Sequence, residues 1–483
     1  MKRMTSFRTR WPRWLAATSL TALAACATMP EQEPASRNVI LFLGDGMGVS
    51  TVTAARIFEG QRQGLAGEEH ALAFEHFPHV ALVKTYNTDG QVPDSAGTMS
   101  AIMTGEKTRV GHIAVGPEVD NDDCPGSLAG KRQTLLEEAE LRGYATGIVS
   151  TARITHATPA ATYAHVPNRN WEADSMLPAP ASAAGCRDIA AQLVEFEPGD
   201  GIDVILGGGR AAFRPAEAPD PEYPDTRGMR ADQTNLVERW SAGAPNRRFV
   251  WNAEQLDALD PAANEQVLGL FEPSHMQFEA DRARDAGGEP SLAELTRFAI
   301  ERLQGRGPGY FLMIEGGRID HAHHFTNAYR ALVDTLALSD AVATAMAMTD
   351  PADTLILVTA DHSHTLTISG YPKRGNPILG KVETLGGTPG LDAQGRPYTT
   401  LGYANGPSHA EPIRDLTEVD TTDPGFQQPA GVPLDVETHS GEDVAAYALG
   451  LNAEALGGVI EQNALHGVMR EALFGGRKQK QKP

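Results

Sequence analysis

Four apolar runs in this chain end abruptly in acidic or histidine residues, and this pattern restricts the folds that are open to it. The run at residues 355–360 leads directly into Asp361-His362-Ser363-His364. Apolar runs of this length are typical of strands buried on both faces of a parallel sheet. Open α/β sheets place ligand-binding side chains at the carboxyl ends of such strands. Because carboxylates and imidazoles are common metal ligands, the pattern predicts a metal site at one edge of a sheet.

The other three runs repeat this arrangement. Residues 39–43 lead into Asp45, whose flanking glycines permit a sharp turn, and residues 432–434 precede His439 in an acidic loop. Residues 311–314 lead into Glu315 and a histidine-rich segment.

A helix that begins after Gly317 would place Asp320 and His324 four residues apart on one face. That spacing suits two ligands of one zinc ion. Each motif alone has an ordinary alternative, namely a turn, a surface Asp-His pair or a solvated helix face. Their recurrence at four strand ends favours a metal site.

Strands that alternate with helices predict an α/β fold with three layers, α/β/α, around a mostly parallel central sheet. The expected strands are 80–83, 146–150, 203–206, 311–314 and 355–359, and the expected helices are 134–142, 188–196, 292–304 and 329–348. Residues 368–431 are rich in Gly, Pro and Thr, and we expect a small inserted β-rich or irregular subdomain there. The catalytic α/β domain would then comprise residues 37–367 and 432–475.

The charge of the chain bears on its partners. It holds 41 basic and 62 acidic residues, a net charge of −21. Such a chain offers no general basic surface to phosphates, so we do not expect nucleic acid as a specific partner. A small anionic substrate remains compatible, because bound metal ions invert the local field.

The first 25 residues have the basic and apolar regions of an export signal that is too short to span a membrane. Leu23-Ala24-Ala25-Cys26 resembles the cleavage motif of bacterial lipoproteins, with Cys26 as the lipidated residue. The alternative is a plain secretory signal. Residues 26–36 would form a tether and residues 476–483 a disordered tail. We expect a periplasmic protein, lipid-anchored to a bacterial membrane and touching it only through that anchor.

Cys124 and Cys186 are the remaining cysteines. Two cysteines in an exported chain indicate one disulfide, and two free thiols are the alternative.

Ser95 lies among small residues in Pro93-Asp94-Ser95-Ala96-Gly97, where a helix could begin and its amino terminus could stabilise an anion. The alternative is an ordinary N-cap. A Gly-x-Ser-x-Gly elbow is absent at Ser95, so metal coordination would have to activate this hydroxyl.

The side chains of His156 and Thr158 would reach the same strand-end region, or mark only a turn before Pro159. Arg169 could hold two phosphoryl oxygens, or lie on the surface.

In order along the chain, these segments resemble the alkaline phosphatase family, in its animal-type branch, from about residue 37 to about residue 472. The motifs that carry the resemblance are Gly44-Asp45-Gly46-Met47-Gly48, Pro93-Asp94-Ser95-Ala96, His156-Ala157-Thr158-Pro159, Asn168-Arg169-Asn170-Trp171, the segment at 203–210, the segment at 315–324, the segment at 359–364 and Glu437-Thr438-His439.

The resemblance implies two zinc ions and one magnesium ion per chain. The residues that match the first zinc site are Asp320, His324 and His439; those that match the second are Asp45, Asp361, His362 and the nucleophile Ser95; those that match the magnesium site are Asp45, Thr158 and Glu315. Arg169 matches the phosphate-binding arginine. His156 and His321 match positions beside the ligands, and His323 and His364 are interpreted in the same way.

The resemblance also implies hydrolysis of phosphate monoesters at alkaline pH through a phosphoserine on Ser95. It supports the disulfide between Cys124 and Cys186, and it implies a homodimer in which residues 368–431 form a crown-like contact. A further, calcium site would comprise Glu222, Phe271, Glu272 and Glu289, although residues 282–290 depart in length from the family pattern.

Two alternatives remain at this point. A phosphodiesterase of the same superfamily would share the two-zinc core, but Arg169, Thr158 and Glu315 favour a monoester, whose dianion needs extra positive charge. A lipid-anchored zinc- or phosphate-binding protein without turnover would not need Ser95. A sulfatase is disfavoured because its Cys/Ser-x-Pro-x-Arg pattern is absent at Ser95.

Overall fold

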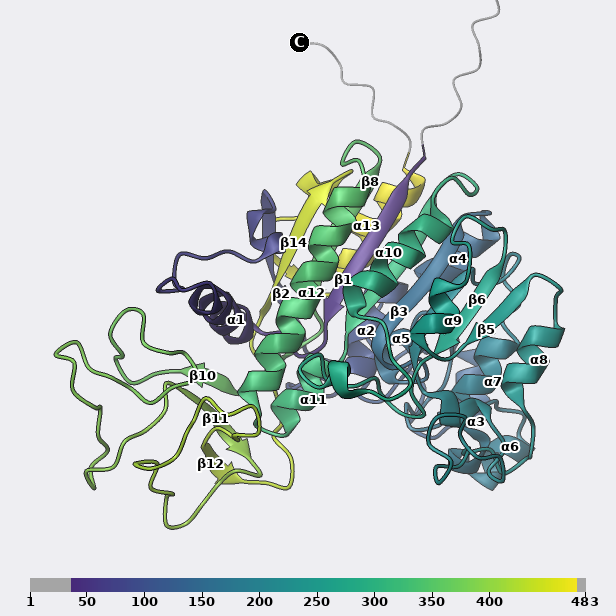
Figure 1. The fold of residues 1–483 in the computed structure, drawn as a ribbon. Helices are drawn as coiled ribbons and strands as arrows, with labels where there is room; N and C mark the ends of the chain where they lie inside the picture. The colour runs from purple at the N-terminus through teal and green to yellow at the C-terminus, as the bar shows by residue number, and fades with distance from the viewer. Residues whose placement is uncertain (1–35, 476–483) are drawn as a thin grey trace, which may run out of the picture. The chain divides into compact units, whose positions relative to one another are not determined.

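The structure of the chain, a computed structural model, describes residues 36–475 (Figure 1). The predicted export signal at residues 1–25, the lipidation candidate Cys26, the tether as far as residue 35 and the tail at 476–483 lie outside the described residues.

The apolar runs form the middle of a ten-stranded sheet. In order across the sheet, its strands are β15 (Gly458–Glu461), β2 (His79–Lys84), β14 (Val444–Gly450), β8 (Thr354–Ala360), β1 (Asn38–Gly44), β7 (Tyr310–Gly316), β3 (Ala145–Arg153), β4 (Val204–Gly208), β6 (Gln266–Leu270) and β5 (Arg247–Val250). Among these ten described strands, β14 alone runs antiparallel to its neighbours, β2 and β8. The predicted mostly parallel sheet is confirmed.

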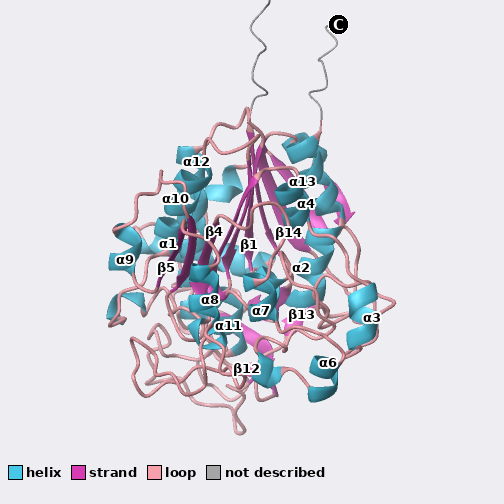
Figure 2. Ribbon diagram, turned by 90° about the vertical axis from the view of Figure 1, so that its right-hand side faces the viewer, coloured by secondary structure: helices cyan, strands magenta, loops and turns pink. Residues whose placement is uncertain are grey.

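Helices cover both faces of this sheet (Figures 1 and 2). One face carries α1 (Val49–Arg62), α10 (Leu292–Leu303) and α12 (Ala328–Met348), and the other carries α2 (Ser95–Thr104), α4 (Leu135–Leu141) and α13 (Ala464–Phe474). Local sequence fixes the helix starts, since Ser291 and Glu294 form a capping box on α10 and Thr134 and Glu137 form one on α4. The three-layer α/β/α prediction is therefore confirmed.

The shorter helices lie in the connections. They are α3 (Cys124–Ala129), α5 (Ala157–Ala160), α6 (Ala179–Ala183), α7 (Ile189–Val194), α8 (Leu236–Ala242), α9 (Ala253–Asp257) and α11 (Arg318–His324), with 3₁₀ turns at η1 (Ala73–His76), η2 (Asp174–Met176), η3 (Arg210–Phe213), η4 (Arg282–Arg284) and η5 (Ala453–Ala455).

The register of the central strands brings their carboxyl ends to one level. Gly44 at the end of β1 pairs with Gly316 of β7 and with Ala360 of β8. Every residue of these three strands is buried. Residues that directly follow β1 and β8 therefore emerge next to each other, as the sequence pattern predicts.

The fourth apolar run behaves differently from the other three. Residues 430–433 form β12 (Ala430–Pro433), which joins β10 (Leu366–Ile368) and β11 (Leu401–Gly406) in a separate three-stranded sheet. His439 lies in the two-residue strand β13 (His439–Ser440), paired antiparallel with β9 (Ser363–His364). Between β10 and β12, residues 369–429 consist of turns and loops apart from β11.

Cys124 and Cys186 form the predicted disulfide, with their Cα atoms 5.9 Å apart. It joins the start of α3 to the segment that precedes α7.

Candidate active site and metal centre

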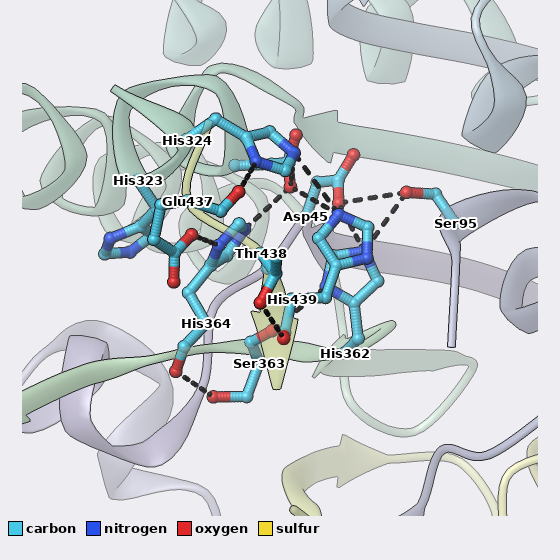
Figure 3. Close-up of polar contacts among 12 residues, drawn as sticks. Asp45, Ser95, His323, His324, His362, Ser363, His364, Glu437, Thr438 and His439 are labelled. Carbon is cyan, nitrogen blue, oxygen red and sulfur yellow. Dashed lines mark hydrogen bonds and ion pairs between the residues drawn. The ribbon is translucent and has the colours of Figure 1, made fainter. Parts of the chain in front are cut away.

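Ser95 lies against the ends of two central strands (Figure 3). Its Oγ atom is 3.2 Å from Nε2 of His362 and 3.4 Å from Oδ1 of Asp45. The same Nε2 atom is 3.4 Å from Asp45 and 3.3 Å from Oδ2 of Asp361. All four side chains are at most 1% exposed. We refer to Ser95, Asp45, Asp361 and His362 as the serine group.

Asp320, His324 and His439 form a second cluster, the histidine group. Oδ1 of Asp320 is 3.3 Å from Nε2 of each histidine, and the two Nε2 atoms are 3.3 Å apart. Four ligands at 2.0–2.1 Å around a tetrahedral zinc ion are about 3.3 Å from one another. The spacing in both groups therefore fits a tetrahedral metal ion held between the donor atoms.

Both histidines of this group are oriented by main-chain carbonyls. Nδ1 of His439 lies 2.8 Å from the carbonyl oxygen of Pro93, and Nδ1 of His324 lies 2.5 Å from that of Glu437. A carbonyl oxygen only accepts, so each Nδ1 carries the proton and each Nε2 presents its lone pair to the group. This is the tautomer that binds a metal ion.

Asp45, Thr158 and Glu315 form a third cluster, the oxygen group. Oδ2 of Asp45, Oγ1 of Thr158 and Oε1 of Glu315 are buried without a hydrogen-bond partner among the described residues. Such unpartnered buried oxygens are costly, and a hard cation with oxygen ligands would satisfy them. His156 also lies within ligand distance of Asp45 and Glu315.

The crowded carboxylates of this region would be stabilised by bound cations. Burial and the nearby Asp361 and Asp320 carboxylates raise the pKa of Asp45 well above its usual value. Burial likewise raises the pKa of Glu315 to about 7. Carboxylates crowded in this way ionise together only when positive charge is supplied.

Arg169 reaches the start of the helix that carries Ser95. Its Nη1 donates to Oδ2 of Asp94 at 3.0 Å, and its Nη2 lies 3.1 Å from Nε2 of His156. Asp94 is the N-cap of α2, since its side chain accepts from the amide of Gly97. The N-cap alternative for this segment is thus correct for Asp94, and Ser95 is the buried first residue of the helix, with its hydroxyl directed at His362 and Asp45.

Comparisons with known proteins agree with this geometry. The family model described as Alkaline phosphatase matches residues 36–474. The chain belongs to the alkaline phosphatase family. It is an enzyme, and the family consists of metal-dependent hydrolases of phosphate monoesters.

Two curated relatives are tissue-nonspecific isozymes of alkaline phosphatase. The isozyme of Gallus gallus is 45% identical over 450 residues, which cover 91% of this chain and 85% of that protein. The isozyme of Homo sapiens is 43% identical over 446 residues, which cover 90% and 83%.

Solved structures share the fold. Alkaline phosphatase from Thermus thermophilus gives a TM-score of 0.64 at 23% identity and covers 95% of this chain and 96% of that one. The alkaline phosphatase from the Antarctic bacterium TAB5 gives a TM-score of 0.62 at 22% identity. The match covers 92% of this chain and 100% of that one. At these identities the structures support the fold alone.

Within this member of the alkaline phosphatase family, His156 and His321 lie beside the oxygen group together with a histidine that we did not predict. His275 packs on His321 with ring centroids 4.0 Å apart and on His156 at 5.3 Å. His275 follows β6 in a segment without a periodic or spacing signal, so sequence reasoning had no basis for selecting it.

His323 and His364 also lie at this site, and a ring nitrogen of His364 comes within 4.8 Å of the donor atoms of Asp320, His324 and His439. His323 lies between Oγ1 of Thr51 at 3.0 Å and the hydroxyl of Tyr403 at 2.8 Å. His364 lies between Asp320 and Glu437, and although burial opposes its charged form, these two carboxylates raise the pKa of His364 to about 10.

The predicted calcium site differs in one residue from the acidic cluster of the structure. The structure groups the carboxylates of Glu222 and Glu272 with that of Asp285. The prediction named Glu289 in place of Asp285. Oε1 of Glu289 instead accepts from the amide of Gln277 at 2.8 Å.

The loop at 282–290 accounts for this difference. It positions Asp285 so that the hydroxyl of Tyr223 contacts both Oδ1 of Asp285 and Oε1 of Glu272, each at 3.0 Å. Phe271 is buried beside Glu272 at the end of β6.

Proposed function

We propose that this enzyme hydrolyses phosphate monoesters to alcohol and inorganic phosphate at alkaline pH through a phosphoserine on Ser95. The observation that carries the proposal is the position of Ser95 Oγ, 3.2 Å from His362 and 3.4 Å from Asp45 at the start of α2. A metal ion held there would activate this hydroxyl without a separate general base.

We assign zinc to the histidine group and to the serine group, and magnesium to the oxygen group. The donor types support this choice, since mixed imidazole and carboxylate sets suit zinc and all-oxygen sets suit magnesium. When bound, these cations would neutralise the phosphoryl charge and lower the pKa of hydroxyls beside them.

The residues act on the phosphoryl group in two displacements. In the first, the deprotonated Oγ of Ser95 forms a bond to phosphorus while the bond from phosphorus to the ester oxygen breaks, and the alkoxide that leaves takes a proton from solvent to become the alcohol. In the second, a water oxygen bonds to phosphorus and gives a proton to solvent, the bond to Oγ breaks to return the deprotonated Oγ, and inorganic phosphate leaves. The planar guanidinium of Arg169 would hold two non-bridging oxygens in both steps, because Asp94 fixes its orientation.

The two alternatives predict different residues. A phosphodiesterase acts on a monoanion and has less need of Arg169, Thr158 and Glu315. A binding protein without turnover has no need of Ser95. These residues therefore support a monoesterase.

The acidic cluster of Glu222, Glu272 and Asp285, with the carbonyl oxygen of Phe271, is our proposed calcium site. The test is the rise in melting temperature on adding calcium to the metal-stripped enzyme. Asp285→Asn should remove most of this rise, whereas Glu289→Gln should keep it. The reverse result would restore Glu289 to the site.

Two further proposals concern the whole protein. We propose that residues 368–431 form a homodimer contact, supported by the exposed apolar residues Tyr371, Leu385 and Ile413 in this region. We also propose that the enzyme is periplasmic and lipid-anchored through Cys26, supported by the signal and cleavage motif. Sedimentation and mass spectrometry of the mature amino terminus test these two points.

The central experiment is hydrolysis of p-nitrophenyl phosphate at alkaline pH by the enzyme without its first 26 residues. Activity should disappear after chelation and return with zinc and magnesium together. Metal-loaded enzyme that binds phosphate without hydrolysing the ester would instead support a binding protein and contradict the role of Ser95.

A further inference from the structure

Glu437 contacts the histidine group through both its side chain and its main chain, although it is no ligand in any of the three groups. It lies in the loop between β12 and β13 and is completely buried. Figure 3 shows its carboxylate on the far side of His364 from the ligand cluster.

The carboxylate reaches Asp320 through one intervening ring. Oε2 of Glu437 lies 2.5 Å from Nδ1 of His364, and Nε2 of the same ring lies 2.7 Å from Oδ1 of Asp320. This Oδ1 atom is the one that is 3.3 Å from both histidine ligands. A change in the position of the His364 ring therefore moves the carboxylate oxygen that would bind the metal ion.

The other carboxylate oxygen fixes Glu437 itself. Oε1 accepts from the amide of Thr365 at 2.7 Å and from its hydroxyl at 2.6 Å. Both oxygens thus have partners, and the carboxylate can take up one orientation only.

The main chain of Glu437 holds a second ligand. Its carbonyl oxygen accepts from Nδ1 of His324 at 2.5 Å, and its amide donates to the carbonyl oxygen of His324 at 3.0 Å. The third ligand, His439, follows two residues later in the same segment. All three ligands of the histidine group therefore depend on the position of this one residue.

We propose that Glu437 is a positioning residue that sets the affinity of the histidine group for zinc, acting through His364 on Asp320. This inference rests on the proposed function, since it assumes that the group holds zinc. Groups that orient metal ligands commonly contribute 10- to 100-fold to metal affinity.

The test is the release of zinc from the full enzyme into an excess of a colorimetric chelator, with zinc content measured by mass spectrometry. Glu437→Ala should release one of two zinc ions roughly 10- to 100-fold faster than the unmodified enzyme. Glu437→Gln keeps the size of the side chain and its Thr365 contacts but loses the carboxylate oxygen that faces His364. We therefore expect this variant to release zinc about tenfold faster than the unmodified enzyme. If Glu437→Ala does not fold, the rate of zinc release from Glu437→Gln tests the proposal by itself.

A double variant separates positioning through His364 from a general loosening of the loop. If Glu437 acts through this ring, Glu437→Gln combined with His364→Ala should release zinc as fast as His364→Ala alone. If the two effects multiply, the proposed route is wrong.

Glu442→Ala provides the matched control. Glu442 lies just after His439, and its carboxylate accepts from the hydroxyls of Ser363 and Ser440. Its removal disturbs the same loop, and zinc release should stay at the unmodified rate. Accelerated release in this control to the level of Glu437→Ala would also contradict the proposal.

The outcomes distinguish this inference from the proposed function. Two zinc ions in the unmodified enzyme and unchanged release from both Glu437 variants would overturn the role of Glu437 alone. An unmodified enzyme that holds no zinc and gains no activity from it would overturn both.

Discussion

The serine group and the histidine group lie side by side, but the fold positions them in different ways. Asp45 and Asp361 directly follow β1 and β8, whose last residues, Gly44 and Ala360, pair in the middle of the sheet. Asp320 and His324 lie on the seven-residue helix α11, and His439 lies in the two-residue strand β13. Backbone pairing over whole strands thus fixes Asp45, Asp361 and His362 of the first group, to which helix α2 adds Ser95, and side-chain contacts complete the second.

The serine group and the histidine group also differ in how far their side chains are exposed to solvent. The side chains of His362 and Asp45 are 0% exposed, whereas those of His324 and His439 are 26% and 15% exposed. A group that is held by short elements and open to solvent moves more easily than one at the ends of buried strands. The comparison indicates that this candidate metal centre combines a half at the ends of buried strands with a half that neighbouring side chains such as Glu437 contact.

The largest effect is expected from Ser95→Ala. Loss of the only nucleophile in the proposed reaction should lower turnover by at least about 10⁴-fold and abolish the phosphoenzyme. Zinc content should persist, because Asp45, Asp361 and His362 remain in place at the ends of β1 and β8. Trapping of radiolabelled phosphoserine and zinc analysis measure the two effects. Phosphoserine formation at an undiminished level in this variant would contradict the assignment of Ser95.

Arg169→Ala should have the next largest effect. Removal of a fixed guanidinium that holds phosphoryl oxygens should lower kcat/KM about 10²- to 10³-fold and weaken inhibition by inorganic phosphate. Metal content should not change, since Arg169 contacts Asp94 and His156 rather than the serine or histidine group. Arg169→Lys should recover only part of the loss, because lysine lacks the planar fork. Unaltered phosphate inhibition in Arg169→Ala would count against this role.

Chelation of the unmodified enzyme tests the comparison itself. We expect zinc to leave in two phases, with the histidine group about tenfold faster than the serine group. Glu437→Gln should accelerate only the fast phase, and Asp361→Asn should accelerate the slow one. A single phase, or acceleration of the slow phase by Glu437→Gln, would show that the two groups do not differ as the structure indicates.

The smallest effect on the reaction is expected at Glu140, remote from both groups. Burial raises the pKa of Glu140 to about 8, and its Oε2 atom has no partner among the described residues. The folded state thus holds this proton more tightly than the unfolded chain. The contribution to stability is complete below the unfolded pKa near 4.5 and is lost as the pH rises to about 8.

Glu140→Gln cannot ionise, so it should avoid a loss of roughly 3 kcal/mol in unfolding free energy between about pH 6 and about pH 9. The exposed Glu301→Gln serves as the control and should retain that loss. Denaturant titrations at both pH values, together with unchanged kcat, check the expectation. Equal pH dependence in Glu140→Gln and the unmodified enzyme would contradict it.

Sequence reasoning identified the features that short-range patterns encode. Apolar runs of strand length predicted β1, β7 and β8, and the acidic or histidine residues behind them predicted that Asp45, Asp361 and His362 would meet. The four-residue spacing predicted that Asp320 and His324 share a face of α11. These features depend on backbone period and strand order, which neighbouring residues determine.

Only the tertiary structure decided the remaining contacts. Asp285 rather than Glu289 joins Glu222, β12 leaves the central sheet for a small one, and Glu437 reaches Asp320 through His364. Each depends on the path of a loop or on a contact between residues far apart in the chain, such as the 73 positions between His364 and Glu437. The sequence by itself determined which strands are buried and which candidate metal ligands follow them. Packing decided which side chains hold those ligands, because no local period specifies where two distant loops meet.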